Sequence, residues 1–301
     1  MDDYKRDSNG TTEESNQRES FVTLLTSDSY LPAVLVLDLS LKRVGSRREL
    51  LVLVTPEISR KTIECLGNLN INVRLVDPIL NPVGDEHLKN VWRILRGKGR
   101  LLKRYSTVYT KLRIWELAEY KKLIFLDSDM MLVRNIDDLF GCPNWSAVIS
   151  GGELRQYRDW RGLNAGLLVI EPSLAVFRDM MSKIRILKSG DWGDQGFLHA
   201  YFPEWGGLEH LHLPHIYNMP VDFFDGYADQ LGYGLSSNDV GDSKAVKVLH
   251  FWGDHKPWET NPRELNLSLF QRKPFYFRSF CLWLSAYCEV CQMVAKEPIK
   301  S

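Results

Sequence analysis

The chain has 301 residues, of which 44% are hydrophobic and 25% are charged, and its formal net charge is zero. These values are typical of a globular protein, and the length is sufficient for a sizeable core. The balanced charge argues against general binding to polyanions, so no nucleic acid partner is predicted. No stretch is long and apolar enough to predict an integral membrane segment.

One stretch departs from this balance, because basic residues concentrate between His87 and Arg113. Two interpretations stay open for it: a solvated helix face, or a surface that meets phosphates or an acidic partner. The basic residues of this stretch are Lys89, Arg93, Arg96, Lys98, Arg100, Lys103, Arg104, Lys111 and Arg113.

The two ends of the chain differ from its middle. Residues 1–20 are polar and contain no apolar run, which predicts a disordered tail and no signal peptide. Residues 276–301 are predicted as a helical segment that packs on the body of the protein or on a membrane surface. This segment carries the CxxC pair Cys288 and Cys291, but no further metal ligands lie nearby in the sequence. The scattered cysteines and the missing signal peptide together predict reduced thiols and a cytoplasmic location.

The first half of the chain alternates predicted strands and helices. The strands are nearly all apolar, which favours an α/β fold with a parallel sheet that helices cover on both faces. In such sheets, ligands bind beyond the carboxyl ends of the strands. Strands are expected at 21–30, where the strand ends in a polar turn, and at 51–55, 71–76 and 123–126; helices are expected at 30–44, 56–68 and 109–120.

The second half is less regular. Short apolar runs predict strands at 146–150, 166–170 and 246–252, and Ser173 is a suitable cap for a helix over 171–187. The stretch 222–244 is rich in Gly, Asp and Ser and is expected to be a long loop. Long loops inside compact domains tend to be functional or mobile.

The stretch LIFLDSDMMLV places Asp127 and Asp129 directly after an apolar strand. Carboxylates at the end of a buried strand are costly unless a cation meets them. Because a single residue separates Asp127 from Asp129, their side chains lie on the same face of the strand and can converge on one ion. Their carboxylate oxygens are hard donors that suit Mg²⁺ or Mn²⁺. The alternative is a solvated turn or a helix cap, although the helix predicted downstream has its own cap in Asn135.

A histidine offers a third ligand. His250 ends the apolar run VKVLH, so it lies at the carboxyl end of another predicted strand. A lone histidine in this position is more often a hydrogen-bonded structural residue. If it instead reaches the two aspartates, its imidazole favours Mn²⁺ over Mg²⁺.

Six segments occur in the same order and at similar spacings as in the glycogenins: FVTLLTSDSY, YTKLRIWELAEYKKLIFLDSDMMLVRNIDDLF, LNAGLLVIEPS, GDQGFLHAYF, LPHIYNM and KVLHFWGDHKPWE. The chain therefore resembles the glycogenin-like retaining glycosyltransferases of family 8, from about Phe21 to Glu259. This resemblance implies a single GT-A domain over 21–275, with a Rossmann-like, mostly parallel central sheet and helices on both faces. The helical segment 276–301 follows it.

The resemblance also implies a metal site and a donor site. Asp127, Asp129 and His250 match the residues that hold Mn²⁺, with Mg²⁺ as the second option, against the two phosphates of a UDP-sugar. Leu24, Thr26, Ser27 and Tyr30 match the segment that binds uracil and ribose, although glycogenins often have Asn where Ser27 stands. The remaining donor contacts implied by matching motifs are Lys111, Ser128, Asn164, Ala165, Gly166, Asp194, Gln195, Gly253 and Lys256.

The residues implied in catalysis are Lys111, Asp191, Asp194 and Gln195. Departure of UDP builds negative charge on the diphosphate, which a divalent ion and Lys256 are suited to stabilise. The sugar becomes oxocarbenium-like, so Asp194 or Gln195 on its other face is suited to assist. Ordinary structural roles stay open for these residues: Asp194 as a helix cap, Lys256 as a solvated lysine, and Asn164 as the support of a turn.

The acceptor is less well defined by the sequence. Glycogenins glucosylate a tyrosine of their own, but Tyr227 and Tyr233 do not stand at the expected spacing, and the C-terminal segment does not resemble the glycogenin segment that docks glycogen synthase. We therefore expect transfer of galactose or glucose, with an α-linkage, to a separate glycan or glycoprotein. Self-glucosylation and a non-catalytic UDP-sugar-binding scaffold are the alternatives, galactinol synthases and plant glucuronosyltransferases are more distant options, and a homodimer is left open.

Overall fold

The computed structural model describes residues 18–81, 107–151, 153–157, 159–191, 193–253, 255–261, 263 and 265–296. The expectation of a disordered tail therefore lies outside the described residues for 1–17. Residues 18–20 already belong to the first strand, so that part of the expectation is wrong. Most of the basic stretch also lies outside the described residues, with Lys111 and Arg113 as its described members.

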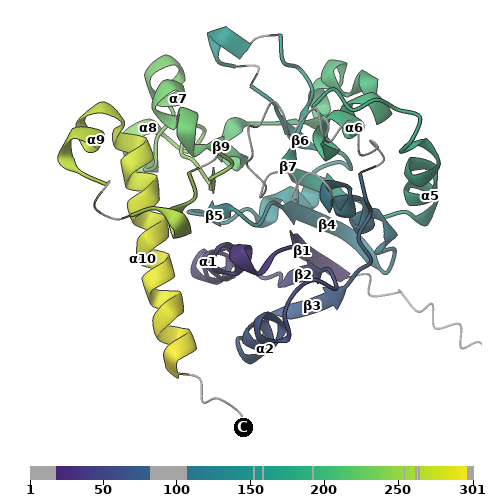
Figure 1. Cartoon of the computed structure of the whole chain (residues 1–301). Helices are drawn as coiled ribbons and strands as arrows, with labels where there is room; N and C mark the ends of the chain where they lie inside the picture. The colour runs from purple at the N-terminus through teal and green to yellow at the C-terminus, as the bar shows by residue number, and fades with distance from the viewer. Residues whose placement is uncertain are drawn as a thin grey trace, which may run out of the picture.

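A seven-stranded sheet forms the centre of the molecule (Figure 1). Its strand order is β3-β2-β1-β4-β7-β6-β8, and β1 to β4 run parallel to one another. Strand β7 runs antiparallel to both of its neighbours, β4 and β6. A smaller sheet, with the order β5-β10-β9, lies beside it. The strands are β1 (Arg18–Leu25), β2 (Leu50–Val54), β3 (Asn72–Leu75), β4 (Tyr120–Leu126), β5 (Met130–Leu132), β6 (Ala147–Ile149), β7 (Leu163–Ile170), β8 (His212–Leu213), β9 (Met219–Pro220) and β10 (Val248–His250).

Helices cover both faces of the central sheet, as the sequence predicts (Figure 1). The α-helices are α1 (Leu31–Arg43), α2 (Arg60–Asn68), α5 (Leu174–Lys183), α6 (Asp194–Tyr201), α7 (Phe224–Leu231), α8 (Ser237–Val240), α9 (Leu267–Arg272) and α10 (Pro274–Lys296). The short 3₁₀ helices are η1 (Asp28–Tyr30), η2 (Val108–Glu116), η3 (Asp137–Gly141), η4 (Arg155–Tyr157), η5 (Pro203–Gly207), η6 (Glu209–Leu211), η7 (His215–Tyr217), η8 (Val221–Phe223) and η9 (Pro257–Glu259).

The core consists of two apolar layers, one on each face of the central sheet, and the inner strands of this sheet contribute side chains to both layers. Along β4, Ile124 and Leu126 pack with α1 and α10, whereas Leu123 and Phe125 pack with η2, α5 and α6. Successive side chains of a strand point to opposite faces, so a strand buried on both sides reads as a continuous apolar run. This arrangement explains why LIFL, with no polar residue, is a strand of the central sheet rather than of an edge.

Three predicted elements need correction. Helix α2 begins at Arg60 rather than at 56, because Ser59 is its cap and accepts a hydrogen bond from the Thr62 amide at 3.3 Å. The helix expected at 109–120 is the 3₁₀ helix η2, which ends at Glu116. Over so short a segment, apolar spacing does not distinguish three residues per turn from 3.6.

The stretch 222–244 is not a long loop, because it contains α7 and α8. One glycine of this stretch, Gly232, has φ of 73° and ends α7 in the left-handed conformation that favours glycine at a helix C-terminus. The cap predicted for α5 is confirmed, since the Ser173 hydroxyl accepts from the Val176 amide.

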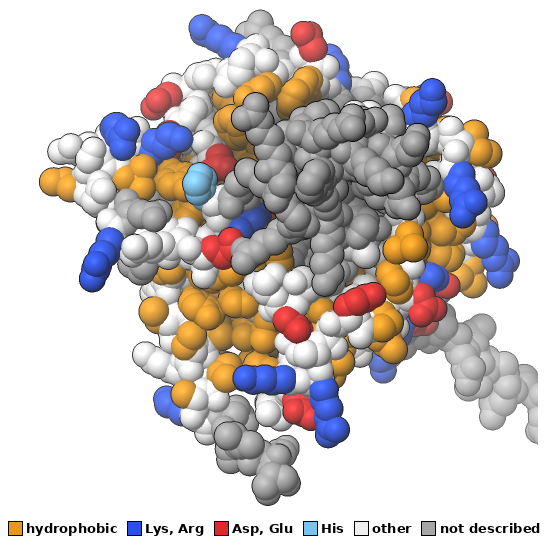
Figure 2. Space-filling view, viewed as in Figure 1, with side chains coloured by type: hydrophobic (Ala, Val, Ile, Leu, Met, Phe, Trp, Pro, Cys, Tyr) orange, Lys and Arg blue, Asp and Glu red, His pale blue; other side chains and the backbone are white. Residues whose placement is uncertain are grey.

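Helix α10 packs along α1 through a stripe that includes Phe280, Trp283 and Val290. Its first turn is fixed by Asp225 of α7, whose carboxylate accepts hydrogen bonds from the amides of Phe275 and Tyr276 at 2.9 and 3.1 Å. Figure 2 shows hydrophobic side chains gathered over the lower part of this helix. None of the described helices is both long and apolar enough to cross a membrane.

Candidate active site

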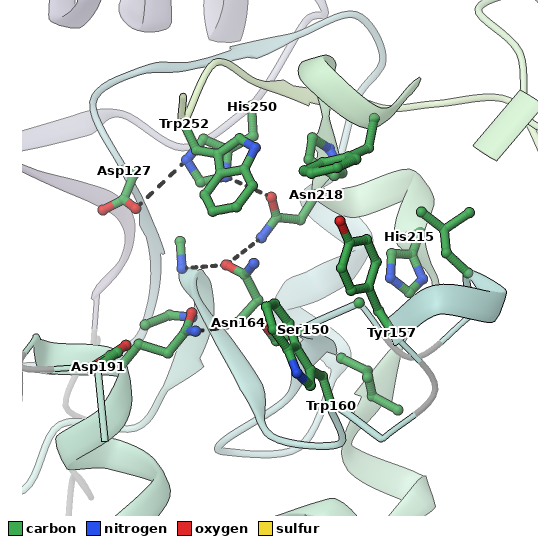
Figure 3. Close-up of a pocket in the computed structure, with 18 of the residues that line it drawn as sticks. Asp127, Ser150, Tyr157, Trp160, Asn164, Asp191, His215, Asn218, His250 and Trp252 are labelled. Atoms are coloured by element: carbon green, nitrogen blue, oxygen red, sulfur yellow. Dashed lines mark hydrogen bonds and ion pairs between the residues drawn. The ribbon is translucent and has the colours of Figure 1, made fainter. Parts of the chain in front are cut away.

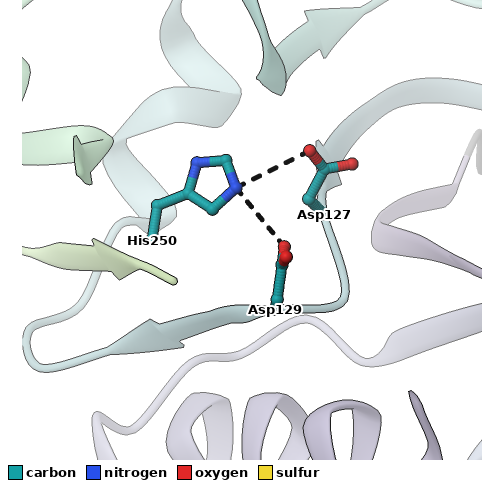
Figure 4. A group of neighbouring side chains, drawn as sticks. All are labelled: Asp127, Asp129 and His250. Atoms are coloured by element: carbon teal, nitrogen blue, oxygen red, sulfur yellow. Dashed lines mark ion pairs between the residues drawn. The ribbon is translucent and has the colours of Figure 1, made fainter. Parts of the chain in front are cut away.

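Two strands bring the predicted metal ligands together. Strand β4 ends at Leu126, and the turn that follows carries Asp127 and Asp129. Strand β10 pairs antiparallel with β5 so that His250 lies opposite Met130, next in sequence to Asp129. One ligand atom from each of the three side chains lies within 4.8 Å of the other two (Figure 4). The structure therefore brings the three predicted ligands together, within reach of a single ion.

A chain of hydrogen bonds sets the orientation of the His250 ring. The backbone amide of Gly166 donates to Asn164 Oδ1 at 2.9 Å, and the same oxygen accepts from Asn218 Nδ2 at 3.0 Å. Because Asn218 Nδ2 is the donor in that contact, Asn218 Oδ1 is the atom that faces His250 Nδ1, 2.9 Å away. It accepts a hydrogen bond from the Nδ1–H group (Figure 3). The other ring nitrogen, Nε2, faces the two aspartates, 3.3 Å from Asp129 Oδ1 and 3.8 Å from Asp127 Oδ2.

This donor set fits a divalent ion. Two carboxylates and one neutral imidazole are ligands that Mn²⁺ accepts readily, and a hydrogen bond on the far ring nitrogen is the usual support for a metal-binding histidine. His250 and Asp129 are both buried, whereas Asp127 is partly exposed at the mouth of the site. Asp127 and His250 also line the cavity described below, so an ion that they hold would be reachable from it.

Two buried lysines flank the aspartates. Lys256 Nζ lies 2.6 Å from Asp129 Oδ2 and 2.6 Å from the carbonyl oxygen of Phe251. Lys111 Nζ lies 3.2 Å from Asp127 Oδ1, contacts Asp194, and donates to the Ala165 carbonyl at 3.0 Å. Burial alone would lower the pKa of Lys111, but the two carboxylates outweigh it, so this pKa lies above its usual value. Burial raises the pKa of Asp127, and Lys111 opposes this effect.

A cavity of about 300 Å³ opens beside the metal ligands (Figure 3). Its polar wall includes Asn164, Gln195 and Asp191. Gln195 Oε1 accepts from the Ala165 amide at 3.1 Å, so its amide nitrogen faces Ser150 Oγ at 3.5 Å. Asp191 Oδ1 accepts from the amides of Gly193 and Gly196, which stabilises the start of α6. Asp194 is the first residue of α6 and points to Lys111.

Two of the predicted site glycines are required by close approaches. A Cβ on Gly166 would lie 2.6 Å from His250 Cε1 and 3.0 Å from Asn164 Oδ1, so only glycine leaves room for the imidazole. A Cβ on Gly253 would collide with the carboxylate of Asp222. Gly166 therefore lets the backbone approach the His250 ring, and Gly253 lets the backbone approach the Asp222 carboxylate.

The residues matched to uracil and ribose binding lie at the carboxyl end of β1, the strand that pairs with β4. They are not among the residues that line the described cavity. Tyr30 packs edge-on against Trp258 at a centroid distance of 5.1 Å, and Ser27 shares a hydrogen bond with Ser29. Ser128, between the two aspartates, is partly exposed.

Sequence reasoning missed several residues of the cavity. Asn218 has the clearest signal in the sequence, because it belongs to the LPHIYNM segment that carries part of the family resemblance. Trp252 has the same kind of signal, since it belongs to the KVLHFWGDHKPWE segment, whereas the other aromatic residues of the cavity lie outside the six segments. They include Tyr157, Trp160 and Phe223.

Solved structures with the same fold define the class of this protein. The galactosyltransferase LgtC, solved in complex with donor and acceptor sugar analogues, superimposes with a TM-score of 0.53 over 87% of this chain and 96% of that chain, at 19% identity. The glycosyltransferase GlyE of Streptococcus pneumoniae gives a TM-score of 0.54 over 95% of this chain and 66% of that chain, at 18% identity. The fold is that of the GT-A glycosyltransferases.

Sequence comparison then gives the family: the chain belongs to glycosyl transferase family 8, whose family model matches residues 21–261. Glycogenin-1 of Homo sapiens is 33% identical over 245 residues, which are 80% of this chain and 62% of that protein. Inositol phosphorylceramide glucuronosyltransferase 1 of Arabidopsis thaliana is 31% identical over 261 residues, which are 83% of this chain and 44% of that protein. The chain thus spans about half the length of these curated relatives.

Proposed function

We propose that this chain is a retaining hexosyltransferase that depends on a divalent ion. It moves galactose or glucose from a UDP-sugar to a separate glycan or glycoprotein acceptor and forms an α-linkage. The observation that carries this proposal is the Asp127–Asp129–His250 cluster, whose ligand atoms lie within 4.8 Å of one another beside the cavity.

The two aspartates and His250 would hold Mn²⁺, which as a Lewis acid offsets the charge on the leaving diphosphate. Lys256, in contact with Asp129, adds a positive charge beside the phosphates, and Gly253 precedes it in the same segment. Leu24, Thr26, Ser27 and Tyr30, at the end of the neighbouring strand β1, are assigned to the uridine. Ser128, which lies between Asp127 and Asp129 in the sequence, is also assigned to the donor site.

The sugar end of the donor is assigned to the polar wall of the cavity. Asn164, Ala165 and Gly166 offer polar backbone and side-chain groups there, and Gln195 presents its amide nitrogen toward Ser150. Asp194 and Lys111 form an ion pair, and we assign this carboxylate and ammonium to the reacting carbon of the donor sugar. Asp191 positions these groups, because it fixes the amino end of the helix that begins with Asp194.

The charge of the cavity favours a neutral donor sugar over glucuronate. Among the described residues that line the cavity, Lys111 is the sole lysine or arginine, and Asp127 and Asp194 already surround it. Among these described residues, a sugar carboxylate would face two carboxylates without a cation of its own. A relative that transfers glucuronate therefore does not provide the best guide to the donor.

Of the two tyrosines considered as internal acceptors, Tyr227 lines the cavity, yet both are almost completely buried. Tyr227 and Tyr233 are only 1% and 2% exposed. The Tyr233 hydroxyl donates to Glu153 Oε2 at 2.8 Å, and burial raises the pKa of both phenols. A hydroxyl that is buried and protonated in this way is a poor nucleophile, so a separate acceptor is favoured.

A panel of UDP-sugars tests the proposal directly. UDP release is measured with Mn²⁺, with Mg²⁺ and with EDTA, for the wild type, Asp127→Ala and Asp129→Ala. We expect release with UDP-galactose or UDP-glucose, the highest rate with Mn²⁺, and a loss of at least a hundredfold in both variants, while the exposed Asp242→Ala variant retains the wild-type rate.

Each other outcome has a defined meaning. Release that persists in Asp127→Ala or Asp129→Ala refutes the metal site. Tight binding of UDP-sugar without release under any condition supports the scaffold alternative. Release with UDP-glucuronate alone refutes the neutral donor. The linkage is read by NMR from the anomeric coupling constant of the first transferred sugar, and a β-product contradicts retention.

A further inference from the structure

Four aromatic rings form a continuous row along the cavity, beginning with Trp252 near His250. The ring of Trp160 lies 5.1 Å from that of Tyr157, which lies 5.6 Å from that of Phe223, and Phe223 lies 5.8 Å from Trp252, all measured between centroids. All four residues line the cavity. We call this set, Trp160, Tyr157, Phe223 and Trp252, the aromatic wall.

The two ends of the aromatic wall are open to solvent. Trp160 is 58% exposed and Trp252 is 45% exposed, although tryptophan is usually well buried. Figure 3 shows Trp252 above the cavity, Tyr157 beside it and Trp160 below it. Large exposed aromatic side chains that meet around one cavity indicate a ligand surface rather than part of the core.

Three separate segments supply the aromatic wall. Tyr157 belongs to η4 and Trp160 follows it, Phe223 ends η8, and Trp252 follows β10 by two residues. His250, at the end of β10, is a proposed metal ligand, so the aromatic wall begins next to the donor site. A molecule that rests on the wall therefore lies beside the sugar that is transferred.

We propose that the aromatic wall is the acceptor site and that it binds a neutral pyranose at the end of a carbohydrate chain. This inference rests on the proposed function, because it names the acceptor class for the same cavity. A pyranose has one face formed mainly by C–H groups, and this face packs well on an indole or phenol ring. The rigid rings of Trp and Tyr provide this contact area at little cost in conformational entropy.

The charges around the aromatic wall favour a neutral acceptor. None of the described residues that line this side of the cavity is a lysine or an arginine. Glu153 contacts His215, a residue of the cavity lining, at 3.4 Å; this contact lowers the pKa of Glu153, which is therefore an anion at neutral pH. A phosphate or a carboxylate on the acceptor would meet no lysine or arginine among the described residues that line this side of the cavity, and Glu153 would repel it.

Saturation-transfer NMR on the full chain, loaded with UDP and Mg²⁺ to avoid paramagnetic broadening, tests the proposal. The neutral probes are lactose and maltose, and the acidic probes are methyl β-glucuronide and inositol 1-phosphate. We expect transfer to C–H protons of at least one neutral probe and none to the acidic probes. In Trp160→Ala or Trp252→Ala, the sugar signal relative to the UDP signal of the same sample falls about tenfold.

Two further variants serve as controls. Trp160→Phe and Trp252→Phe keep a ring and should recover most of the neutral-probe signal, whereas Leu282→Ala removes an exposed apolar side chain of α10, outside the cavity, and should change nothing. The acceptor assignment is overturned by an absence of transfer to both neutral probes, by equal transfer to acidic probes, or by an undiminished signal in both alanine variants. If UDP itself does not bind, the proposed function fails instead.

Discussion

The buried pair of Asp129 and Lys256 provides a quantitative test of the site. Asp129 is 3% exposed and Lys256 is 5% exposed, and Lys256 Nζ lies 2.6 Å from Asp129 Oδ2. Removal of one partner of such a pair costs about 3–5 kcal/mol, because the other charge is left buried without compensation. Here Lys256 keeps the Phe251 carbonyl at 2.6 Å, so we expect the lower end of this range, about 3 kcal/mol, for Asp129→Ala.

A double-mutant cycle separates this effect from a general loss of packing. The variants are Asp129→Ala, Lys256→Met and the double variant, all measured in EDTA so that no divalent ion binds. Each single variant should lose about 3 kcal/mol in urea unfolding followed by circular dichroism, and the melting temperature should fall by roughly 6 °C. The double variant should be no less stable than either single one, which gives a coupling energy of about 3 kcal/mol. Additive losses would refute the claim that these two charges compensate each other.

Three further predictions concern neighbouring parts of the structure. Gly166→Ala should lower the affinity for Mn²⁺ by about tenfold to a hundredfold in calorimetry, because the new Cβ displaces the His250 ring, and an unchanged affinity would contradict the close approach. Asp225→Ala should cost about 1–2 kcal/mol in thermal unfolding by freeing two amides of α10, and the exposed Asp229→Ala of the same helix is the control. Incubation with UDP-glucose or UDP-galactose and Mn²⁺ should add no hexose to the intact mass, and a gain that Tyr227→Phe abolishes would restore self-glycosylation.

The sequence predicts the central strands of this fold well, because a short, continuous apolar run between polar turns is typical of a strand buried on both faces. Strand β4 is such a strand, and the change from its apolar run to Asp127 and Asp129 marks its carboxyl end. The same holds for His250, since the carboxyl end of an apolar strand is a recognisable position. Residue types and their places on strands therefore indicate these three positions as candidates, and the family resemblance is what joins them into one predicted metal site.

The aromatic wall could not be predicted in this way. Its residues come from η4, η8 and two irregular segments, and no periodic pattern relates Trp160 to Trp252. Their proximity depends on how separate loops meet in space. The stretch 222–244 illustrates the same limit, because glycine and aspartate are common both in loops and at the ends of short helices such as α7.

The reversed direction of β7 explains why the polar groups of the site are so well ordered. In a purely parallel sheet, the edge where strands end would present carbonyl groups beside the carboxylates. Because β7 runs antiparallel to β4, its first residues, Leu163 to Gly166, lie at the carboxyl end of β4 and bring backbone N–H groups there. The Gly166 amide fixes Asn164, and through Asn218 it fixes the His250 tautomer, while the Ala165 amide fixes Gln195. One reversed strand thus orients both the proposed metal ligand and the proposed donor-binding amide.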